Sequence, residues 1–340
     1  MIPLHQGTNT LDLHPKVLDA IKQPIEYGYY GDANGSKDLR AKILDHYNID
    51  SDEYEIILTS GSLAALHLII DNCYPKYKNF VDIIPGWHWM RLMAKDRGYG
   101  ICPVHSRKIK PEDIVENSIV FLVNGQNPTG FVYSHEEFYE LQEEAKNKKS
   151  MLLHDIAYYD FFETPYPLLL NEDNFLVFSF SKGAGLASLR VGGLVASKKS
   201  FQNIPEAVPN RIGINVIGER AAMASLEYYD EWKPKNIQLV RKNQDRIRQE
   251  LSPLGVKFFG PDAVHRIVLT LDEKIDPTEF NKKMASEGVQ LLDISTRSYD
   301  VGVKHTNDPP FTNSLQATAA ISDEWLDRFI EKFKKVYQSL

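Results

Sequence analysis

Short apolar runs that alternate with amphipathic stretches occupy the middle of this chain and restrict its fold more than any other feature. Five such runs cover residues 80–84, 118–123, 151–154, 176–180 and 193–196. Each run is too short for a helix and reads as a buried strand, whereas residues 62–72 and 135–146 between them have a helical pattern. Continuous apolar strands joined through helices indicate a mostly parallel sheet that is covered on both faces. We therefore expect an α/β domain here.

The two ends of the chain have a different pattern. Helical patterns occupy residues 15–21, 37–46, a stretch from Glu219 to 251, 277–287 and 323–338, and strand-like runs lie at 267–271 and 289–294. The length of 340 residues is about twice that of a usual domain. We therefore expect a large domain over residues 28–228 and a smaller α+β domain formed by both ends, residues 1–27 and 229–340.

Composition excludes several classes of function. The chain has 39 basic and 46 acidic residues, a net charge of −7, and no long run of one sign. This balance argues against a nucleic-acid partner, and no apolar run approaches the ~20 residues that cross a membrane. Two cysteines and ten scattered histidines predict neither a disulfide framework nor a metal site. With no basic and apolar leader after Met1, we expect a cytoplasmic protein.

Lys182 follows one of the apolar runs and lies among small residues, in the segment SFSKGAGLASLRVGG at 179–193. A lone lysine at the end of a strand is commonly a solvated surface charge. The glycine spacing does not match a phosphate-binding loop. The alternative is an amine that forms a Schiff base with an aldehyde cofactor, which requires a lysine held beside that cofactor.

An aldehyde cofactor such as pyridoxal phosphate (PLP) needs further partners, and the sequence contains a candidate for each. Its ring nitrogen needs a carboxylate, and Asp155 stands at the end of the run 151–154. Its phenolic oxygen needs donors, which Asn127 in the turn NPTG and Tyr158 offer. Its phosphate needs free N–H groups, hydroxyls and a cation. The start of the helical pattern at 62 and the flanks of Lys182 supply Ser60, Gly61, Ser62, Ser179 and Arg190.

Three segments in this order carry a family resemblance: NPTG at 127–130, DIAYYDF at 155–161 and SFSKGAGLASLRVG at 179–192. Together they resemble the motifs of the PLP-dependent fold-type I aminotransferases of class I/II, with the histidinol-phosphate aminotransferase-like branch most similar. The resemblance implies the PLP-transferase fold of type I, with a mostly parallel seven-stranded-type sheet in the large domain. It also implies transfer of an amino group between an amino substrate and a 2-oxo acid through a Schiff base on Lys182.

The resemblance assigns a role to each matched residue. Lys182, Asp155 and Tyr158 would be catalytic, and Lys182 would also carry the proton between the substrate carbon and the cofactor. Trp87, in PGWHW at 85–89, would stack on the cofactor ring, with Trp89 as the competing candidate. Tyr30 matches a tyrosine that, in relatives, reaches the phosphate of the neighbouring subunit, so we expect a homodimer.

Gln316 departs from the family pattern. Relatives usually carry an arginine in a strand before the last helix, where it binds the α-carboxylate or phosphate of the substrate. Here the segment NSLQATA at 313–319 has a neutral amide, which does not neutralise an anion. Three explanations stay open: the substrate lacks that anion, Arg266 or Arg297 has replaced the arginine, or the C-terminal register differs.

Two other classes of function compete with transamination. PLP-dependent decarboxylases, lyases or oxidases share the fold, and the same ring stabilises a carbanion whichever bond breaks. A binding protein on an inactive scaffold is the other alternative. The presence of Lys182, Asp155, Tyr158 and Arg190 together argues against it.

Overall fold

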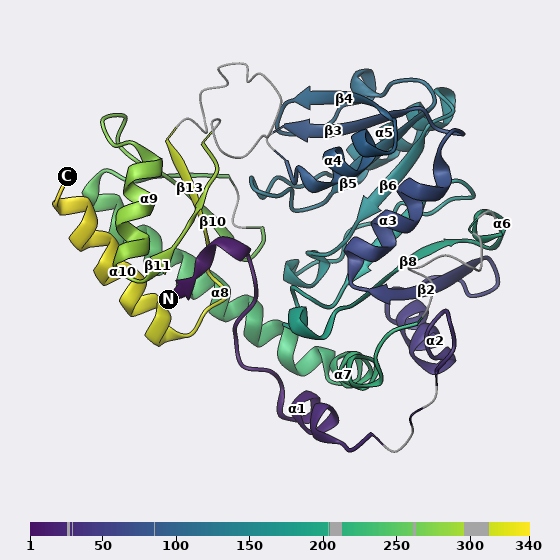
Figure 1. The fold of residues 1–340 in the computed structure, drawn as a ribbon, viewed down its shortest axis with the longest axis horizontal. Coiled ribbons are helices and arrows are strands. Elements are labelled where there is room, and N and C mark those ends of the chain that lie inside the picture. The colour runs from purple at the N-terminus through teal and green to yellow at the C-terminus, as the bar shows by residue number, and fades with distance from the viewer. Residues whose placement is uncertain are drawn as a thin grey trace.

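A seven-stranded sheet forms the larger part of the molecule (Figure 1). The computed structural model describes residues 1–25, 28, 30–84, 86–202, 204, 213–260, 263–295 and 313–340. Across the sheet the strands lie in the order β2 (Tyr54–Ser60), β8 (Val191–Ser197), β7 (Phe175–Ser179), β6 (Met151–Asp155), β5 (Ser118–Val123), β3 (Asn79–Ile84) and β4 (Gly100–His105). All neighbours from β7 to β4 are parallel, and β8 runs antiparallel to both β7 and β2. The mostly parallel seven-stranded sheet expected from the sequence is confirmed.

Helices cover both faces of this sheet because alternate strand residues point to opposite sides. Leu153 of β6 packs in one buried cluster with helices α3 (Ser62–Cys73) and α4 (Trp89–Asp96). Its neighbour Leu152 packs in the other cluster with α2 (Lys37–His46), α5 (His135–Asn147) and α7 (Val216–Glu227). The shorter elements of this part of the chain are α6 (Lys198–Phe201), η2 (Pro111–Asp113), η3 (Tyr159–Phe161) and η4 (Ala187–Leu189). The two-faced covering is the arrangement that continuous apolar strands predict.

Strands β2 and β4 were missed by the sequence pattern. In β4 the side chains are only partly buried or exposed, and Pro103 interrupts the run, as is usual for an edge strand. In β2 the apolar run is confined to Ile56, Ile57 and Leu58, because the strand begins and ends on polar residues. Short or mixed runs of this kind lack the continuous apolar pattern that marks the inner strands.

A second, four-stranded antiparallel sheet lies beside the first, at the left in Figure 1. Its order is β12 (Leu292–Asp293), β13 (Ser314–Thr318), β10 (Arg266–Thr270) and β9 (Lys257–Phe259). Around it are α9 (Pro277–Ser286), α10 (Asp323–Gln338), η5 (Ser252–Leu254) and the long α8 (Tyr229–Leu251), which runs toward it from the larger sheet.

The N-terminal segment joins the two sheets. β1 (Ile2–Pro3) pairs with β11 (Val289–Gln290), and η1 (Leu4–Gln6) contacts β13, whereas α1 (Pro15–Lys22) packs against α7. Between these elements the segment crosses from one sheet to the other. The division into residues 28–228 and residues 1–27 with 229–340 stays a proposal, which the separate sheets support. None of the described helices has the length and apolar character needed to span a membrane.

Candidate active site

One edge of the large sheet gathers most of the residues singled out by the sequence. Asp155 ends β6, Lys182 lies just after β7, and Asn127 lies just after β5. Arg190 precedes β8, which runs the opposite way, so it lies at the same edge. The carboxyl ends of parallel strands form a crevice where α/β proteins bind ligands. The strand order therefore brings these side chains to one place.

The amine of Lys182 is held by the backbone of the N-terminal segment. Its Nζ donates a hydrogen bond of 2.8 Å to the carbonyl oxygen of Gly7. Burial and the positive charges of Arg266 and Arg190 together lower the pKa of Lys182 to about 7, although the charge of Asp155 opposes this shift. A large fraction of this amine is therefore neutral near pH 7, which is the form that attacks an aldehyde.

Asp155 is a buried carboxylate with few partners. Its side chain accepts a hydrogen bond of 2.8 Å from the backbone N–H of Ala157. Burial raises the pKa of Asp155 to about 6, although that hydrogen bond and the charges of Lys182 and Arg266 favour the ionised form. Such a group gains from an additional cationic partner, because a buried charge is costly unless it is paired.

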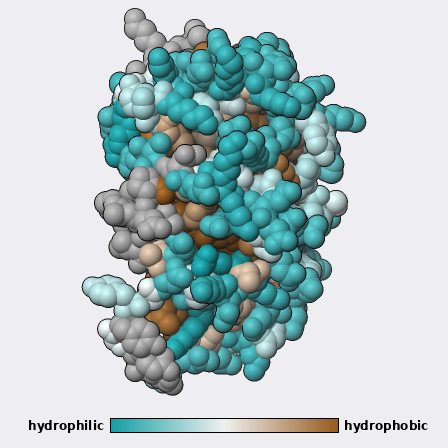
Figure 2. All heavy atoms as spheres, turned by 90° about the vertical axis from the view of Figure 1, so that its right-hand side faces the viewer, coloured by the Kyte–Doolittle hydropathy of each residue, from teal (hydrophilic) through white to brown (hydrophobic). Residues whose placement is uncertain are grey.

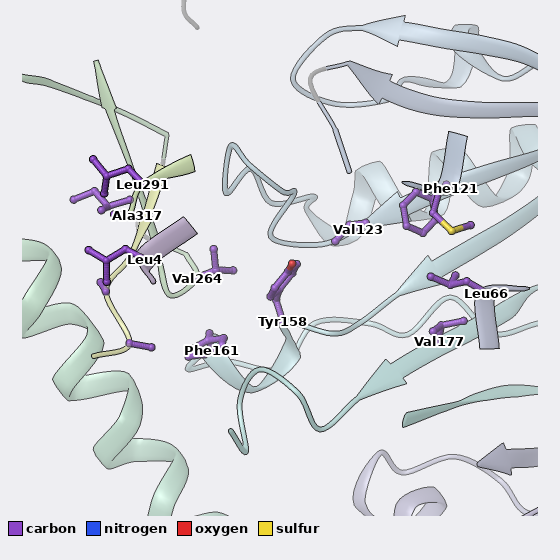
Figure 3. Close-up of a cluster of buried hydrophobic side chains, with 14 of the residues drawn as sticks. Leu4, Leu66, Phe121, Val123, Tyr158, Phe161, Val177, Val264, Leu291 and Ala317 are labelled. Carbon is purple, nitrogen blue, oxygen red and sulfur yellow. The ribbon is translucent and has the colours of Figure 1, made fainter. Parts of the chain in front are cut away.

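Tyr158 and Arg266 meet between the two sheets. In Figure 3, Tyr158 stands between Val123 and Val177 of the large sheet and Val264 on the side of the small sheet. The guanidinium of Arg266 lies 4.3 Å from the centre of the Tyr158 ring, and its Nη2 donates a hydrogen bond to the Tyr158 hydroxyl. Arg266 was one of two candidate replacement arginines in the sequence, and the structure brings it beside Tyr158.

Sequence reasoning missed Gly7 and His265. The carbonyl oxygen of Gly7 accepts from Nε2 of His265 at 2.7 Å as well as from Lys182. His265 is fully buried and stacks on Phe161, and burial, with Arg266 and Lys182 nearby, holds its pKa well below the usual range. The imidazole is therefore neutral and carries its proton on Nε2. No sequence signal marks Gly7, because it acts through its backbone.

A candidate anion-binding cup lies where α3 begins. Gly61 caps this helix with φ +76°, and Arg190 donates hydrogen bonds to the carbonyl oxygens of Ser60 and Ala187 at 3.4 and 2.9 Å. Gly192 packs closely against the start of α3, since a Cβ on this residue would lie 2.6 Å from the backbone nitrogen of Ser62. A helix N-terminus with a guanidinium beside it favours an anion such as a phosphate.

Ser179 and Asn127 lie at the same edge of the large sheet as Asp155. Ser179 ends β7 opposite Gly192 and accepts a hydrogen bond of 3.1 Å from the N–H of Ser181. The amide oxygen of Asn127 is buried, with no hydrogen-bond partner in the described part of the chain. Buried amides are rarely left without a partner, so this atom favours a ligand at this edge.

The remaining candidates differ in their burial. Trp87 is half-buried against the core, whereas Trp89 is 55% exposed and starts α4, which favours Trp87 as the aromatic wall. Tyr30 is 99% exposed. Gln316 is buried in β13 directly opposite Val268 of β10, on a strand shortly before α10 as the sequence indicated.

The other sequence candidate for the substrate anion, Arg297, lies outside the described residues. No group of three described His, Cys, Asp or Glu side chains is arranged to hold a metal ion.

Comparison with known proteins identifies the family. Residues 1–333 match the family model described as aminotransferase class I and II. The chain belongs to this family. Among curated relatives, this aminotransferase is 28% identical over 342 residues to the histidinol-phosphate aminotransferase of Staphylococcus carnosus (strain TM300), covering 92% of this chain and 88% of the relative. It is 26% identical over 273 residues to the aspartate aminotransferase of Sulfurisphaera tokodaii, covering 73% and 68%.

Solved structures show the same fold. The histidinol-phosphate aminotransferase of Clostridium acetobutylicum superposes with a TM-score of 0.82 at 20% identity, over 100% of both chains. The aspartate aminotransferase of Thermus thermophilus with maleate gives 0.83 at 18% identity, over 99% of this chain and 91% of that one. The predicted family and fold are confirmed, and the enzyme class is a transferase of nitrogenous groups acting on small amino and oxo-acid substrates.

Proposed function

We propose that this aminotransferase uses PLP, bound at Lys182, to move an amino group between an amino substrate and a 2-oxo acid. The observation that carries the proposal is the buried amine of Lys182, whose pKa falls to about 7. It lies at the same sheet edge as the buried carboxyl of Asp155 and the cup of Arg190. A reactive amine, a carboxylate and an anion site at one edge match the aldehyde, ring nitrogen and phosphate of PLP.

The described residues fit the polar parts of this cofactor. Asp155 would pair with the protonated ring nitrogen, a cationic partner that favours the ionised form of this buried carboxyl. The amide N–H₂ of Asn127 and the hydroxyl of Tyr158 would donate to the phenolic oxygen. Ser60, Gly61, Ser62, Ser179 and Arg190 would hold the phosphate at the start of α3, and Trp87 would cover one face of the ring.

When bound, PLP withdraws electrons from the substrate carbon that bears the amino group. Lys182 would take a proton from that carbon and return it, because an amine with a pKa near 7 can do both at neutral pH. Asp155 would hold a proton on the ring nitrogen through its charge. Tyr158 and Val123 are buried at this edge, and their side chains would help to exclude water from the reacting atoms.

We also propose that the enzyme is a homodimer in which Tyr30 reaches the phosphate cup of the partner. Tyr30 is 99% exposed in the single chain, and two other exposed apolar side chains, Leu63 and Trp89, lie beside Ser62 and Trp87 in sequence. Figure 2 shows apolar patches in the middle of an otherwise hydrophilic face. Contact with a partner subunit would remove the aromatic side chain of Tyr30 from water, which is favourable for a large aromatic group.

A cytoplasmic location is part of the same proposal. Cys73 and Cys102 are both free thiols, and burial raises the pKa of each. Unpaired, unreactive thiols suit a reducing compartment.

A panel of substrates tests the reaction type. The purified holoenzyme is mixed with amino acids, amines and amino phosphates, and the visible absorbance of the cofactor is followed together with the products. Transamination predicts release of the oxo product with the amino group kept on the enzyme until an acceptor is added. Release of carbon dioxide, ammonia or hydrogen peroxide in step with turnover would instead identify a decarboxylase, a lyase or an oxidase.

A further inference from the structure

Arg266 and Gln316 lie on the same face of the small sheet. In the register of β10 and β13, Arg266 is opposite Thr318 and Val268 is opposite Gln316. Because side chains alternate along a strand, these four share one face, while Ile267, Leu269, Leu315 and Ala317 pack into the core on the other. Arg266 therefore projects from the face that carries Gln316, one strand away and two residues along.

The guanidinium of Arg266 is buried with its hydrogen-bonding capacity largely unused. The side chain is 5% exposed, and Nη1 is buried without a hydrogen-bond partner in the described part of the chain. Nη2 donates to the Tyr158 hydroxyl, and Nε lies against Gly7, where a Cβ would come within 2.9 Å of it. An arginine has five N–H donors and is always charged. Burying it with donors unused is therefore costly, unless an anion accepts hydrogen bonds from them and neutralises the charge.

The charges around the site leave Arg266 without a full counter-charge. Arg266 and Arg190 both lower the pKa of Lys182, and Asp155 is the one carboxylate that opposes them there. Under the proposed function the phosphate of PLP neutralises Arg190, and the ring nitrogen engages Asp155. Neither pairing supplies an acceptor for Nη1 of Arg266, which has no hydrogen-bond partner in the described part of the chain.

We propose that Arg266 binds the carboxylate of the amino substrate and so replaces the arginine that Gln316 lacks. This inference rests on the proposed function, and it assigns α-amino acids and 2-oxo acids, rather than simple amines, as the substrate class. A guanidinium fork suits a carboxylate because two parallel N–H groups meet its two oxygens. Lys182 and Arg266 both contact Gly7, so a carboxylate on Arg266 holds the neighbouring carbon close to the Lys182 amine.

Binding of unreactive carboxylates to the holoenzyme tests this proposal. Maleate and acetate are titrated calorimetrically into protein whose bound PLP has first been measured by absorbance. Arg266→Gln should weaken maleate binding at least tenfold, and Arg266→Lys should restore part of the affinity by restoring the charge. The matched control is Arg248→Gln, since Arg248 also lies over an aromatic ring, that of Phe258 at 4.9 Å, and should bind maleate as the wild type does.

The outcomes separate this inference from the proposed function. A wild-type protein without PLP contradicts the proposed function before any carboxylate is added. With PLP in place, equal maleate affinity in wild type and Arg266→Gln overturns the assignment of Arg266, as does a wild type that binds neither maleate nor acetate. Arg266-dependent binding of inorganic phosphate without binding of either carboxylate overturns it too, because the residue then recognises a phosphate group.

A second readout uses turnover of matched substrates. For an α-amino acid that the substrate panel shows to react and the amine formed by removing its carboxylate, kcat/KM is measured in wild type and Arg266→Gln. The variant should lose at least tenfold for the amino acid and little for the amine. A loss of the same size for both substrates would show that Arg266 supports the site without binding the carboxylate.

Discussion

The guanidinium of Arg266 lies 4.3 Å from the centre of the Tyr158 ring and also donates a hydrogen bond to the hydroxyl of that residue. Arg266 belongs to the small sheet, and Tyr158 follows β6 of the large one. This single contact therefore joins the part of the site that would hold the cofactor to the part that would hold the substrate. It also orients the hydroxyl that we assign to the phenolic oxygen of PLP.

Tyr158→Phe tests the cofactor side of this contact. The change removes one hydrogen bond to the cofactor and leaves another donor of Arg266 without its acceptor. We expect PLP to dissociate more readily by about 1–2 kcal/mol, which is roughly 5- to 30-fold in Kd. Equilibrium dialysis of the holoenzyme measures this, with Tyr159→Phe as the neighbouring control. Equal retention of PLP in both variants would refute the role of the Tyr158 hydroxyl.

The reactivity of Lys182 should follow its lowered pKa. In the cofactor-free protein, acylation of Lys182 should have a midpoint near pH 7, where an ordinary lysine is almost fully protonated. Arg266→Gln should move this midpoint to higher pH, because it removes a positive charge that lowers the pKa. Mass spectrometry of the Lys182 peptide across a pH series gives the midpoint. A midpoint near 10 in the wild type would contradict the electrostatics described for the site.

Asp155 should make the stability of the cofactor-free protein depend on pH. Its folded pKa of about 6 is above its unfolded value, so its stabilising contribution is full below about pH 4 and is lost as pH rises through 6. Asp155→Asn avoids the cost of the buried charge. Relative to wild type, the variant should therefore gain on the order of 1–3 kcal/mol between pH 4.5 and pH 8. Urea denaturation at both pH values measures the difference, and an unchanged difference would count against a raised pKa.

Gly192→Ala should damage the phosphate cup. The added Cβ would meet the backbone nitrogen of Ser62 at 2.6 Å and the carbonyl oxygen of Phe178 at 2.7 Å, and backbone atoms move less easily than side chains. We expect a loss of about 1–3 kcal/mol in stability together with weaker PLP binding. Gly31→Ala is the control, because no atom lies within 4 Å of its Cβ. Thermal unfolding should separate the two variants, and equal melting temperatures would speak against the close packing of the cup.

Tyr30→Phe tests the shared site. If the hydroxyl of Tyr30 donates to the phosphate in the partner subunit, its loss should weaken PLP retention by about 1 kcal/mol. Sedimentation should show a dimer at micromolar concentration in both proteins. A wild type that is monomeric and fully active under these conditions would rule out a site shared between subunits.

The inner part of the fold was predictable because its strands are buried on both faces. Runs such as residues 118–123 can be identified without the structure, and β5 has these same bounds. The edge strand β4 could not be identified in this way, because it is only partly buried and lacks a continuous apolar run. Its place in the sheet depends on contacts with β3 that the local pattern does not contain.

The sequence predicted which side chains gather at the candidate site where they belong to motifs at the ends of strands, as Asp155 and Lys182 do. It was not predictable where the contact is made by backbone or across the two sheets. The carbonyl oxygen of Gly7 accepts hydrogen bonds from Lys182 and from His265, and both residues lie far from Gly7 in the sequence. Likewise the sequence left Arg266 as one of several explanations for Gln316. The shared sheet face and the contact with Tyr158 favour it.

Borohydride reduction tests the central claim, that Lys182 binds the cofactor, most directly. The holoenzyme is reduced, digested and examined by mass spectrometry, with Lys182→Ala treated in parallel. We predict that PLP becomes covalently fixed to the peptide containing Lys182, and that the alanine variant has no fixed PLP and no turnover. PLP fixed to another lysine in the wild type, or full turnover by Lys182→Ala, would contradict the account.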